Sequence, residues 1–424
     1  TSITKGRSNQ QPHSRRPRIA MLWEQFAPYH IDRIEAAAAR LANRADIVGI
    51  EVATASETYD WPPSGAVRGA EKRTLFPQMT YEAVGAWRRF RAQLRTAWGC
   101  RLVMIGIGYN RPDVLLLGWV LRLTGHRVVM MSDSKYDDRQ RSVWTELGKS
   151  LLLRCFNAAL VAGHRQEAYF RFLGFGARPI LQGYDTISAE RIRAEAAVPQ
   201  SDPVRFEDRP FLFVGRFVPK KNLPTLLDAY ASYVASAGDQ ARRLRMVGSG
   251  ELEGQLRQRC AELGIADRVD FTGFLNSREI AVEMRSALAL LLISTEEQWG
   301  LVVNEAVALG LPVILSSTVG AYDLLVRNLL NGVVVETDST AGVAAAMAHV
   351  AADEARWQHL SQASQDRAWY GDADRFADAV ASLYPLMNNL TPHQQLEIPD
   401  TLSKQCRNSK IDRNIDRPED GKFK

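Results

Sequence analysis

The stretch Ser294-Thr-Glu-Glu-Gln-Trp-Gly-Leu-Val-Val-Asn-Glu305 decides how this sequence is interpreted. An apolar run at 287–293 precedes it and predicts a buried strand, and a periodic apolar segment at 300–309 predicts a helix that Gly300 opens. Glu297 is therefore expected in the loop at the strand's carboxyl end, and Glu305 in the second turn of the helix. Free N–H groups at a helix N-terminus favour a phosphate, whereas carboxylates accept hydrogen bonds from sugar hydroxyls. A phosphate flanked by sugars is a nucleotide-sugar; the alternative is that Glu297 caps the helix or lies in solvent and that Glu305 is a surface residue.

A second stretch, Phe211-Leu-Phe-Val-Gly-Arg-Phe-Val-Pro-Lys-Lys-Asn222, has the same strand, loop and helix order. Arg216 and Lys221 follow the predicted strand at 211–215. Two cations at a strand's carboxyl end can clamp a diphosphate, since arginine supplies a planar fork of donors and lysine a point charge. The alternative is a solvated basic turn.

Strand-like apolar runs alternate with helix-like segments in two series around these stretches. The first series predicts strands at 19–23, 47–53, 102–107, 127–131, 158–162 and 178–182, and helices at 31–43, 112–123, 139–155 and 164–173. The second predicts strands at 211–215, 243–248, 269–272, 287–293, 312–316 and 332–335, and helices at 223–235, 250–263, 277–285, 300–309, 341–352, 354–368 and 375–386. This alternation predicts an α/β fold with two doubly wound parallel sheets, each covered on both faces.

A chain of 424 residues is long enough for two or three domains of ~100–200 residues each. We predict a flexible leader at 1–17, a first domain at 18–190, a linker at 191–209, a second domain at 210–370, a C-terminal helix at 371–388 that packs back on the first domain, and a disordered polar tail at 389–424. Ligands of doubly wound sheets bind at the carboxyl ends of the strands. The two domains are therefore expected to face each other across a cleft that holds the site.

Composition excludes several classes of protein. With 46% hydrophobic and 24% charged residues the chain is ordinary for a globular protein, which argues against a disordered, collagen-like or coiled-coil chain. The four cysteines contain no Cys-x-x-Cys pair, so neither a disulfide framework nor a zinc site is expected. The seven histidines are isolated, and the one Asp-x-Asp, at 372–374, is interpreted as a helix cap, so no metal site is predicted. The scattered cysteines fit a reducing, cytosolic setting. Apolar runs are too short for a membrane span or a signal peptide, which favours a soluble or peripheral protein.

The net charge of +5 hides a difference between the two halves. Residues 1–185 carry 27 Lys and Arg and 16 Asp and Glu, giving +11, whereas the remainder carries 26 and 32, giving −6. The basic half is expected to face an anionic partner. Nucleic acid is a poor candidate because no recognition motif accompanies the charge.

Residues 87–98 suggest what that partner is. Trp87, Phe90, Leu94 and Trp98 recur at helical spacing, with Arg88, Arg89, Arg91 and Arg95 between them. Such a pattern is typical of amphipathic helices that lie in an anionic membrane surface. The alternative is a surface helix that packs its aromatic stripe on its own sheet.

Taken together, the motifs resemble those of retaining glycosyltransferases of family 4, the glycosyl transferases group 1, which have the GT-B fold of two Rossmann-like domains. The resemblance rests on Gly-Arg-x4-Lys at 215–221, Glu-x7-Glu at 297–305, Gly248-Ser-Gly-Glu251, Phe271-Thr-Gly-Phe-Leu275 and Gly310-Leu-Pro-Val-Ile314. It is strong over residues 211–335 and weaker back to residue 18.

The resemblance implies roles for individual residues. Arg216 and Lys221 would bind the donor diphosphate and stabilise the leaving group, Glu297 would contact the transferred sugar, and Glu305 would bind the ribose hydroxyls. The donor site would also include Gly215, Gly248, Gly273, Phe274, Leu275, Trp299, Gly300 and Leu301. It further implies a UDP- or GDP-linked donor, with neither a metal nor another cofactor.

The first domain departs from the family pattern. Many members have a glycine pair after the first strand, whereas this chain has Trp23-Glu-Gln-Phe-Ala-Pro-Tyr-His30. Tyr29 and His30, just before the predicted helix at 31–43, are candidates for acceptor or phosphate contact; the alternative is that His30 only starts the helix. Where many members have a histidine after the strand at 127–131, this chain has Ser132-Asp-Ser, and Asp133 is a candidate for orienting the acceptor or merely part of a turn.

The resemblance predicts a retaining hexosyltransferase that transfers a sugar to a glycan or lipid-linked glycan in bacterial surface polysaccharide synthesis. Its expected location is the cytoplasm, including the inner face of the cytoplasmic membrane. Two alternatives stay open at this point: a non-catalytic nucleotide-sugar-binding module and a nucleotide-sugar epimerase.

Overall fold

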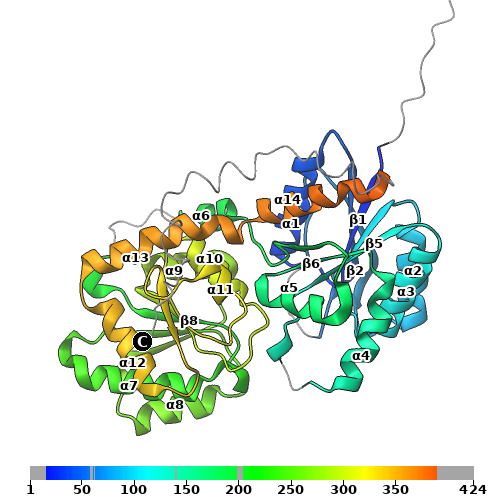
Figure 1. The fold of residues 1–424 in the computed structure, drawn as a ribbon. Coiled ribbons are helices and arrows are strands. Elements are labelled where there is room, and N and C mark those ends of the chain that lie inside the picture. The colour runs from blue at the N-terminus through cyan, green and yellow to red at the C-terminus, as the bar shows by residue number, and fades with distance from the viewer. Residues whose placement is uncertain (1–15, 58–60, 62, 139–140, 198–203, 389–424) are drawn as a thin grey trace, which may run out of the picture. The chain divides into compact units, whose positions relative to one another are not determined.

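The computed structural model describes residues 16–57, 61, 63–138, 141–197 and 204–388. The predicted disordered tail, most of the predicted leader and part of the predicted linker lie outside these ranges. By its internal contacts the chain forms one unit through Ser382, and this unit holds both sheets (Figure 1). None of the described helices is both long and apolar enough to cross a membrane.

The first half forms a seven-stranded parallel sheet with the strand order β3-β2-β1-β4-β5-β6-β7. Its elements are β1 Arg18–Trp23, α1 Pro28–Leu41, β2 Asp46–Ala55, β3 Glu71–Thr80, α2 Ala86–Ala97, β4 Leu102–Ile105, α3 Pro112–Leu123, β5 Arg127–Ser132, α4 Val143–Leu152, β6 Ala158–Val161, α5 His164–Phe170 and β7 Ile180–Gln182. The edge strand β3 was not predicted, because its sequence Glu-Lys-Arg-Thr-Leu-Phe-Pro-Gln-Met-Thr has no sustained apolar run.

The second half forms a six-stranded parallel sheet with the order β10-β9-β8-β11-β12-β13. Its elements are α6 Ala189–Ala196, β8 Phe211–Val214, α7 Leu223–Ala237, β9 Leu244–Val247, α8 Glu253–Glu262, β10 Val269–Gly273, α9 Ser277–Ser286, β11 Ala289–Leu292, α10 Leu301–Ala308, β12 Val313–Ser316, α11 Tyr322–Leu325, β13 Gly332–Val335, α12 Thr340–Ala351, α13 Glu354–Arg367 and α14 Ala373–Leu383. The prediction of two doubly wound parallel sheets is confirmed.

The strand order fixes where a ligand can bind in each sheet. The order of connection reverses between β1 and β4 in the first sheet and between β8 and β11 in the second. Loops that leave the strands on either side of such a switch point run in opposite directions and leave a crevice at the carboxyl ends of the strands. In the second sheet these are the loops at 215–222 and 293–300, which hold both of the stretches that the sequence singled out.

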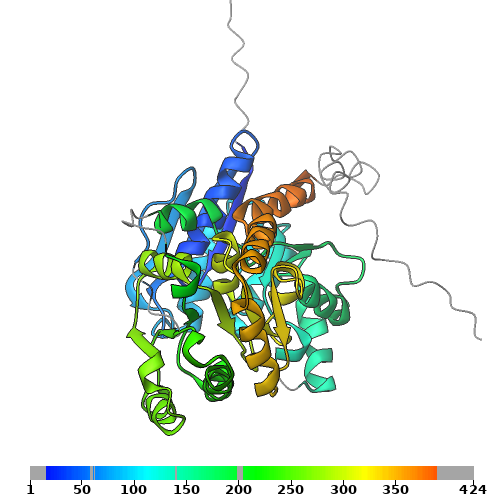
Figure 2. The same cartoon turned by 90° about the vertical axis from the view of Figure 1, so that its left-hand side faces the viewer.

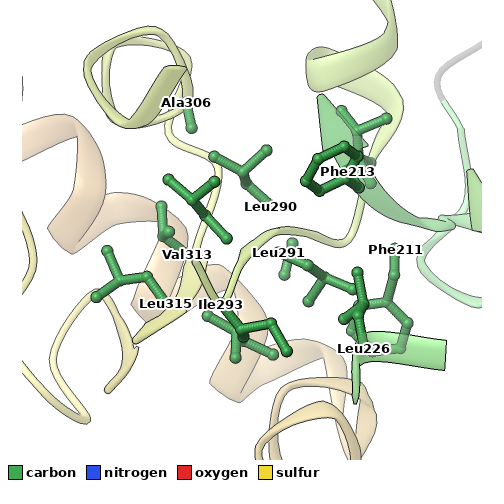
Figure 3. Packing of buried hydrophobic residues seen from close by; sticks show 14 of the residues in the cluster. Phe211, Phe213, Leu226, Leu290, Leu291, Ile293, Ala306, Val313 and Leu315 are labelled. Carbon is green, nitrogen blue, oxygen red and sulfur yellow. The ribbon is translucent and has the colours of Figure 1, made fainter. Parts of the chain in front are cut away.

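The second sheet is held by a continuous apolar core (Figure 3). Strand β11 has the sequence Ala-Leu-Leu-Leu and is fully buried, as expected of a central parallel strand with helices on both faces. Side chains of β8, β11 and β12 meet Leu226 of α7 and Ala306 of α10 in this core. The rigid strands therefore fix the starting points of the two loops at the switch point.

Helices follow the last strand of each sheet, and the segment after β7 differs from the prediction. The segment predicted as a linker begins inside helix α6, which packs against α9 and α10. The helices α13 and α14 follow one another around a 3-10 turn at Ala368–Gly371 (Figures 1 and 2). Asp372 lies just before α14, and its Oδ1 accepts a hydrogen bond from the N–H of Asp374 at 2.9 Å, so its interpretation as a cap is confirmed.

Candidate functional site

The two loops at the switch point of the second sheet meet through an ion pair. Lys221 Nζ donates a hydrogen bond to Glu297 Oε2, and the two side chains are only 13% and 14% exposed. These residues are 76 positions apart, but β8 and β11 are neighbours in the sheet, so their following loops start side by side. Ser294 Oγ also donates to Glu297 Oε2 at 3.3 Å. Lys221 and Glu297 thus form one cluster, and exposed Arg216 lies at the start of the same loop as Lys221.

Asn222 holds this loop in place, a role that the sequence did not reveal. Its Nδ2 donates to the carbonyl oxygens of Ile293, at 3.3 Å, and Thr337, at 2.7 Å. Its backbone has φ 57°, in the left-handed region that asparagine tolerates better than most residues. An asparagine directly before a predicted helix was the available signal, but the carbonyl groups that it binds come from distant parts of the chain.

Backbone rather than side chains lines the edge formed by β8, β9 and β10. The N–H of Gly248 donates to Gly273 O at 2.9 Å, and the N–H of Gly215 donates to Val247 O at 3.0 Å. A Cβ atom on Gly248 would lie 2.0 Å from Gly215 O, so only glycine fits there. Three of the predicted donor glycines, Gly215, Gly248 and Gly273, therefore lie together, and Phe274, which follows Gly273, is 76% exposed.

The N-terminus of α10 opens beside Glu297. Gly300 is the residue before the helix and has φ 98°, a conformation that glycine adopts without strain. The first N–H groups of a helix have no carbonyl partner within it and attract anions. Trp299, which was predicted to lie in the donor site, can offer a donor only its backbone groups. Its ring is buried, and its Nε1 donates a hydrogen bond to Asn304 Oδ1 at 2.9 Å.

Glu305 does not join the Lys221–Glu297 cluster. It is half-buried on α10, and the charged groups that act on it are Arg191, Glu195 and Asp32. Burial raises the pKa of Glu305 to about 7; Arg191 opposes this shift, and the two carboxylates add to it. Keeping Glu305 ionised therefore costs the folded protein free energy. Hydrogen bonds from the hydroxyl groups of a ligand would offset this cost.

The first-domain candidates occupy a different position from the one predicted. Helix α1 begins at Pro28, not at residue 31, because proline is well suited to the first helical turn. Tyr29 and His30 therefore lie within that turn, and the expectation that they precede the helix was wrong.

His30 has a structural partner in that turn. Its Nδ1 accepts a hydrogen bond from the N–H of Ala27 at 3.0 Å, and its ring stacks on Trp23 at 4.7 Å. Burial and, secondarily, Arg33 hold the pKa of His30 well below its usual value. The ring is therefore neutral near pH 7, with its proton on Nε2.

Asp133 follows β5, where the sequence placed it at a strand's carboxyl end. Burial raises the pKa of Asp133, Asp138 and Glu297 raise it further, and Arg33 lowers it. Asp133 is therefore within electrostatic range of Glu297, although the two residues come from different sheets.

A buried ion pair near Asp133 was missed by the sequence analysis. Arg33 Nη2 donates to Asp185 Oδ1 at 3.1 Å, and both side chains are buried. The partners are 152 positions apart, so no local pattern could pair them. Burial raises the pKa of Asp185 to about 7, with Arg33 opposing the shift.

Two side chains of α5 connect loops of the two sheets. Gln166 Nε2 donates to Gln298 O at 2.9 Å, and Arg165 Nη1 donates to Ser317 O at 2.8 Å. The first turn of α5 thus contacts the loops after β11 and β12. Within the described ranges, no group of three or more His, Cys, Asp or Glu side chains is placed to hold a metal ion.

Helix α2 has only part of the predicted membrane face. Trp87 and Trp98 are exposed, as are Arg88, Arg91 and Arg95, but Phe90 is buried. Arg89 is buried too, and its Nε donates to Asp113 Oδ2 at 2.8 Å. Arg89 therefore does not belong to the exposed basic face of α2, because α3 supplies a buried carboxylate that draws it inward.

The structure thus defines an α/β protein with two parallel doubly wound sheets and, at the switch point of the second, a lysine–glutamate pair beside a helix N-terminus. Residues 199–367 match the family described as "Glycosyl transferases group 1". A D-inositol 3-phosphate glycosyltransferase of Geodermatophilus obscurus is 34% identical over 201 residues, which are 45% of this chain and 43% of that relative. The chain thus spans less than half the length of the curated relatives it matches.

Solved structures share the whole architecture. Sucrose-phosphate synthase of Thermosynechococcus elongatus superposes with a TM-score of 0.65 at 20% identity, over 88% of this chain and 99% of that one. The HepE protein of Anabaena, solved with UDP and glucose, superposes with a TM-score of 0.64 at 17% identity, over 88% and 100%. The chain has the GT-B fold that the sequence predicted, and its match to the glycosyl transferases group 1 family covers residues 199–367.

Proposed function

We propose that this protein is a retaining glycosyltransferase of family 4 that uses a nucleotide-sugar donor. The observation that carries the proposal is the contact of Lys221 with Glu297 at the β8/β11 switch point, next to the N-terminus of α10. A cation and a helix N-terminus suit a diphosphate, and a carboxylate beside them suits sugar hydroxyls. The similarity to HepE, which was solved with UDP and glucose, favours UDP over GDP as the nucleotide.

In this proposal the residues act mainly through electrostatics. Arg216 and Lys221 bind the diphosphate and stabilise the charge that grows on it as the bond to the sugar breaks. Glu297 accepts hydrogen bonds from the transferred sugar, and Glu305 accepts them from the ribose. The glycine backbone at Gly215, Gly248 and Gly273 gives the nucleotide close access, with Phe274 and Leu275 beside the base.

The acceptor would lie on the first domain, near Tyr29, His30 and Asp133, with the two domains closing over both substrates to exclude water. The neutral His30 offers Nε2–H as a hydrogen-bond donor, and the half-buried Asp133 can accept a hydroxyl proton. We propose a glycan or lipid-linked glycan acceptor in bacterial surface polysaccharide synthesis, which fits the positive charge of the first half. The exposed arginines of α2 would meet an anionic membrane surface.

The first experiment is a thermal-shift screen of UDP- and GDP-sugars, because a ligand that binds only the folded state raises Tm with its concentration. Sugar transfer to glycan acceptors is then followed by mass detection with the best donor. We expect Lys221→Ala and Glu297→Ala each to lower kcat by about 100-fold, and the exposed neighbour Glu296→Ala to leave it unchanged.

Three other outcomes would overturn parts of the proposal. Donor binding without transfer to any acceptor favours the non-catalytic binding module, and an altered nucleotide-sugar without acceptor favours the epimerase. Full transfer by both Lys221→Ala and Glu297→Ala would show that the active site lies elsewhere.

A further inference from the structure

Helix α4 turns its apolar side to the solvent. Six of its residues are exposed, and five of them are large and apolar; they are Val143, Trp144, Leu147, Leu151 and Leu152, with Thr145 as the sixth. Trp144 is 81% exposed. A surface helix of a globular protein ordinarily has the opposite arrangement, with apolar residues inward and polar ones outward.

Polar contacts on the inner side of α4 fix this orientation. Glu146 is buried and accepts hydrogen bonds from Tyr169 Oη at 2.6 Å and from Lys149 Nζ at 2.7 Å. Arg141, just before the helix, donates to the same Tyr169 oxygen at 2.9 Å. Rotating α4 to bury its leucines would pull Glu146 from these donors, so the apolar side is held outward by a satisfied polar network.

Further exposed apolar side chains extend this surface. Phe172, on the helical turn η3 at Arg171–Phe175 that packs against α4, is exposed and lies 5.6 Å from the ring of Tyr136. Helix α3, with Leu116 and Leu123 exposed, packs against α2 and against the turn η2 at Leu153–Cys155, which continues α4. Figure 1 shows α2, α3 and α4 along one side of the first sheet. We call the exposed apolar residues of α4 and η3, with Tyr136, the α4 surface.

The charge around the α4 surface identifies its partner. Residues 86–178, which include α2, α3, α4 and η3, hold 16 Lys and Arg and six Asp and Glu, a net charge of +10. Asp113 is buried and paired with Arg89, and Glu146 is buried and paired with Lys149, whereas the side chain of Asp137 is 44% exposed. A second copy of this chain would bring the same positive charge to the interface, whereas an anionic bilayer would complement it. Tryptophan and tyrosine are also the side chains that favour the membrane–water boundary.

The geometry points to the α4 surface as a site that inserts into an anionic lipid bilayer, with the arginines of α2 and α3 binding the headgroups. Tyr136 is three residues from Asp133, so the membrane would lie beside the acceptor candidates and a lipid-linked acceptor could reach them without leaving the bilayer. This consequence for the acceptor rests on the proposed function, whereas the binding of lipid does not.

The test is flotation of the full chain with vesicles of phosphatidylglycerol and phosphatidylcholine, and with phosphatidylcholine alone. We expect binding to the anionic vesicles, a loss of at least about tenfold in the partition coefficient for Trp144→Ser/Leu147→Ser, and a similar loss for Arg88→Gln/Arg91→Gln/Arg95→Gln. Arg89 is left intact because it is structural. The matched controls lie in the second half: Leu330→Ser, also an exposed leucine, and Arg243→Gln/Arg257→Gln/Arg278→Gln, which removes the same charge; both should bind like the wild type.

Unchanged binding of the Trp144→Ser/Leu147→Ser variant, or equal binding to neutral vesicles, would overturn the inference. So would a concentration-dependent dimer in sedimentation that this variant abolishes, without any vesicle binding, since the partner would then be a second copy. Circular dichroism confirms that each variant is folded. The thermal shift by the donor should be the same in the variant and the wild type, so a failure of donor binding in both would count against the proposed function alone.

Discussion

Replacing Glu305 by glutamine should stabilise the protein without donor, and more so at high pH. Burial raises the pKa of Glu305 from 4.5 to about 7. The folded state therefore holds a proton more tightly than the unfolded state, and stability falls as the pH rises from about 4.5 to 7. Since one pKa unit corresponds to about 1.4 kcal/mol, the ionised carboxylate costs the folded state about 3 kcal/mol at pH 8 and about 1 kcal/mol at pH 5.

Glutamine cannot ionise, so Glu305→Gln should remove this cost. For a chain of this length we expect Tm to rise by about 4 °C at pH 8 and by about 1 °C at pH 5. Differential scanning calorimetry of the variant and the wild type at both pH values measures the effect. The control is Glu296→Gln, since an exposed carboxylate should change Tm equally and only slightly at the two pH values.

The donor should reduce the difference in Tm between the variant and the wild type. If Glu305 accepts hydrogen bonds from the ribose, the variant loses a charged acceptor and its Kd for the donor should rise about tenfold. An equal fall of Tm at both pH values would refute the burial argument. An unchanged donor Kd would refute the assignment to the ribose while leaving the burial argument intact.

Three other predictions concern backbone packing, the buried arginine and metal dependence. Gly248→Ala should lower Tm by several degrees and weaken the donor-induced thermal shift, because its Cβ would meet Gly215 O at 2.0 Å; Gly254→Ala, whose Cβ meets nothing within 4 Å, should do neither, and equal effects would contradict the packing argument. Arg89→Gln should cost about 3 kcal/mol in urea unfolding because it leaves Asp113 buried and unpaired, whereas the exposed Arg88→Gln should cost less than about 0.5 kcal/mol; similar costs would mean that the pair is not structural. Transfer should keep its rate in excess EDTA if Arg216 and Lys221 meet the leaving-group charge, and a loss that Mg²⁺ or Mn²⁺ restores would contradict this.

The local sequence determined most of the elements and the residue types at the donor site. Buried parallel strands such as β11 are uninterrupted apolar runs, so their ends, and with them the loops carrying Lys221 and Glu297, can be located without a structure. The same rule missed β3, an edge strand with charged residues, and misplaced the start of α1 by three residues. Strand β3 was missed because an edge strand is partly exposed and need not be an uninterrupted apolar run. The start of α1 was misplaced because a helix can begin at a proline.

Only the tertiary structure decided which of these residues act together. Strand order is set by the packing of crossover helices, not by local preference, and it brings the loop of Lys221 to that of Glu297 while leaving Glu305 among Arg191, Glu195 and Asp32. Pairs such as Arg33 with Asp185 join distant parts of the chain and leave no local signal. The same holds for the side that a helix buries: Asp113 draws Arg89 inward from α2, and the donors around Glu146 turn the leucines of α4 outward. The periodicity of a helix defines its two faces, but the neighbours that the fold supplies decide which of them meets water.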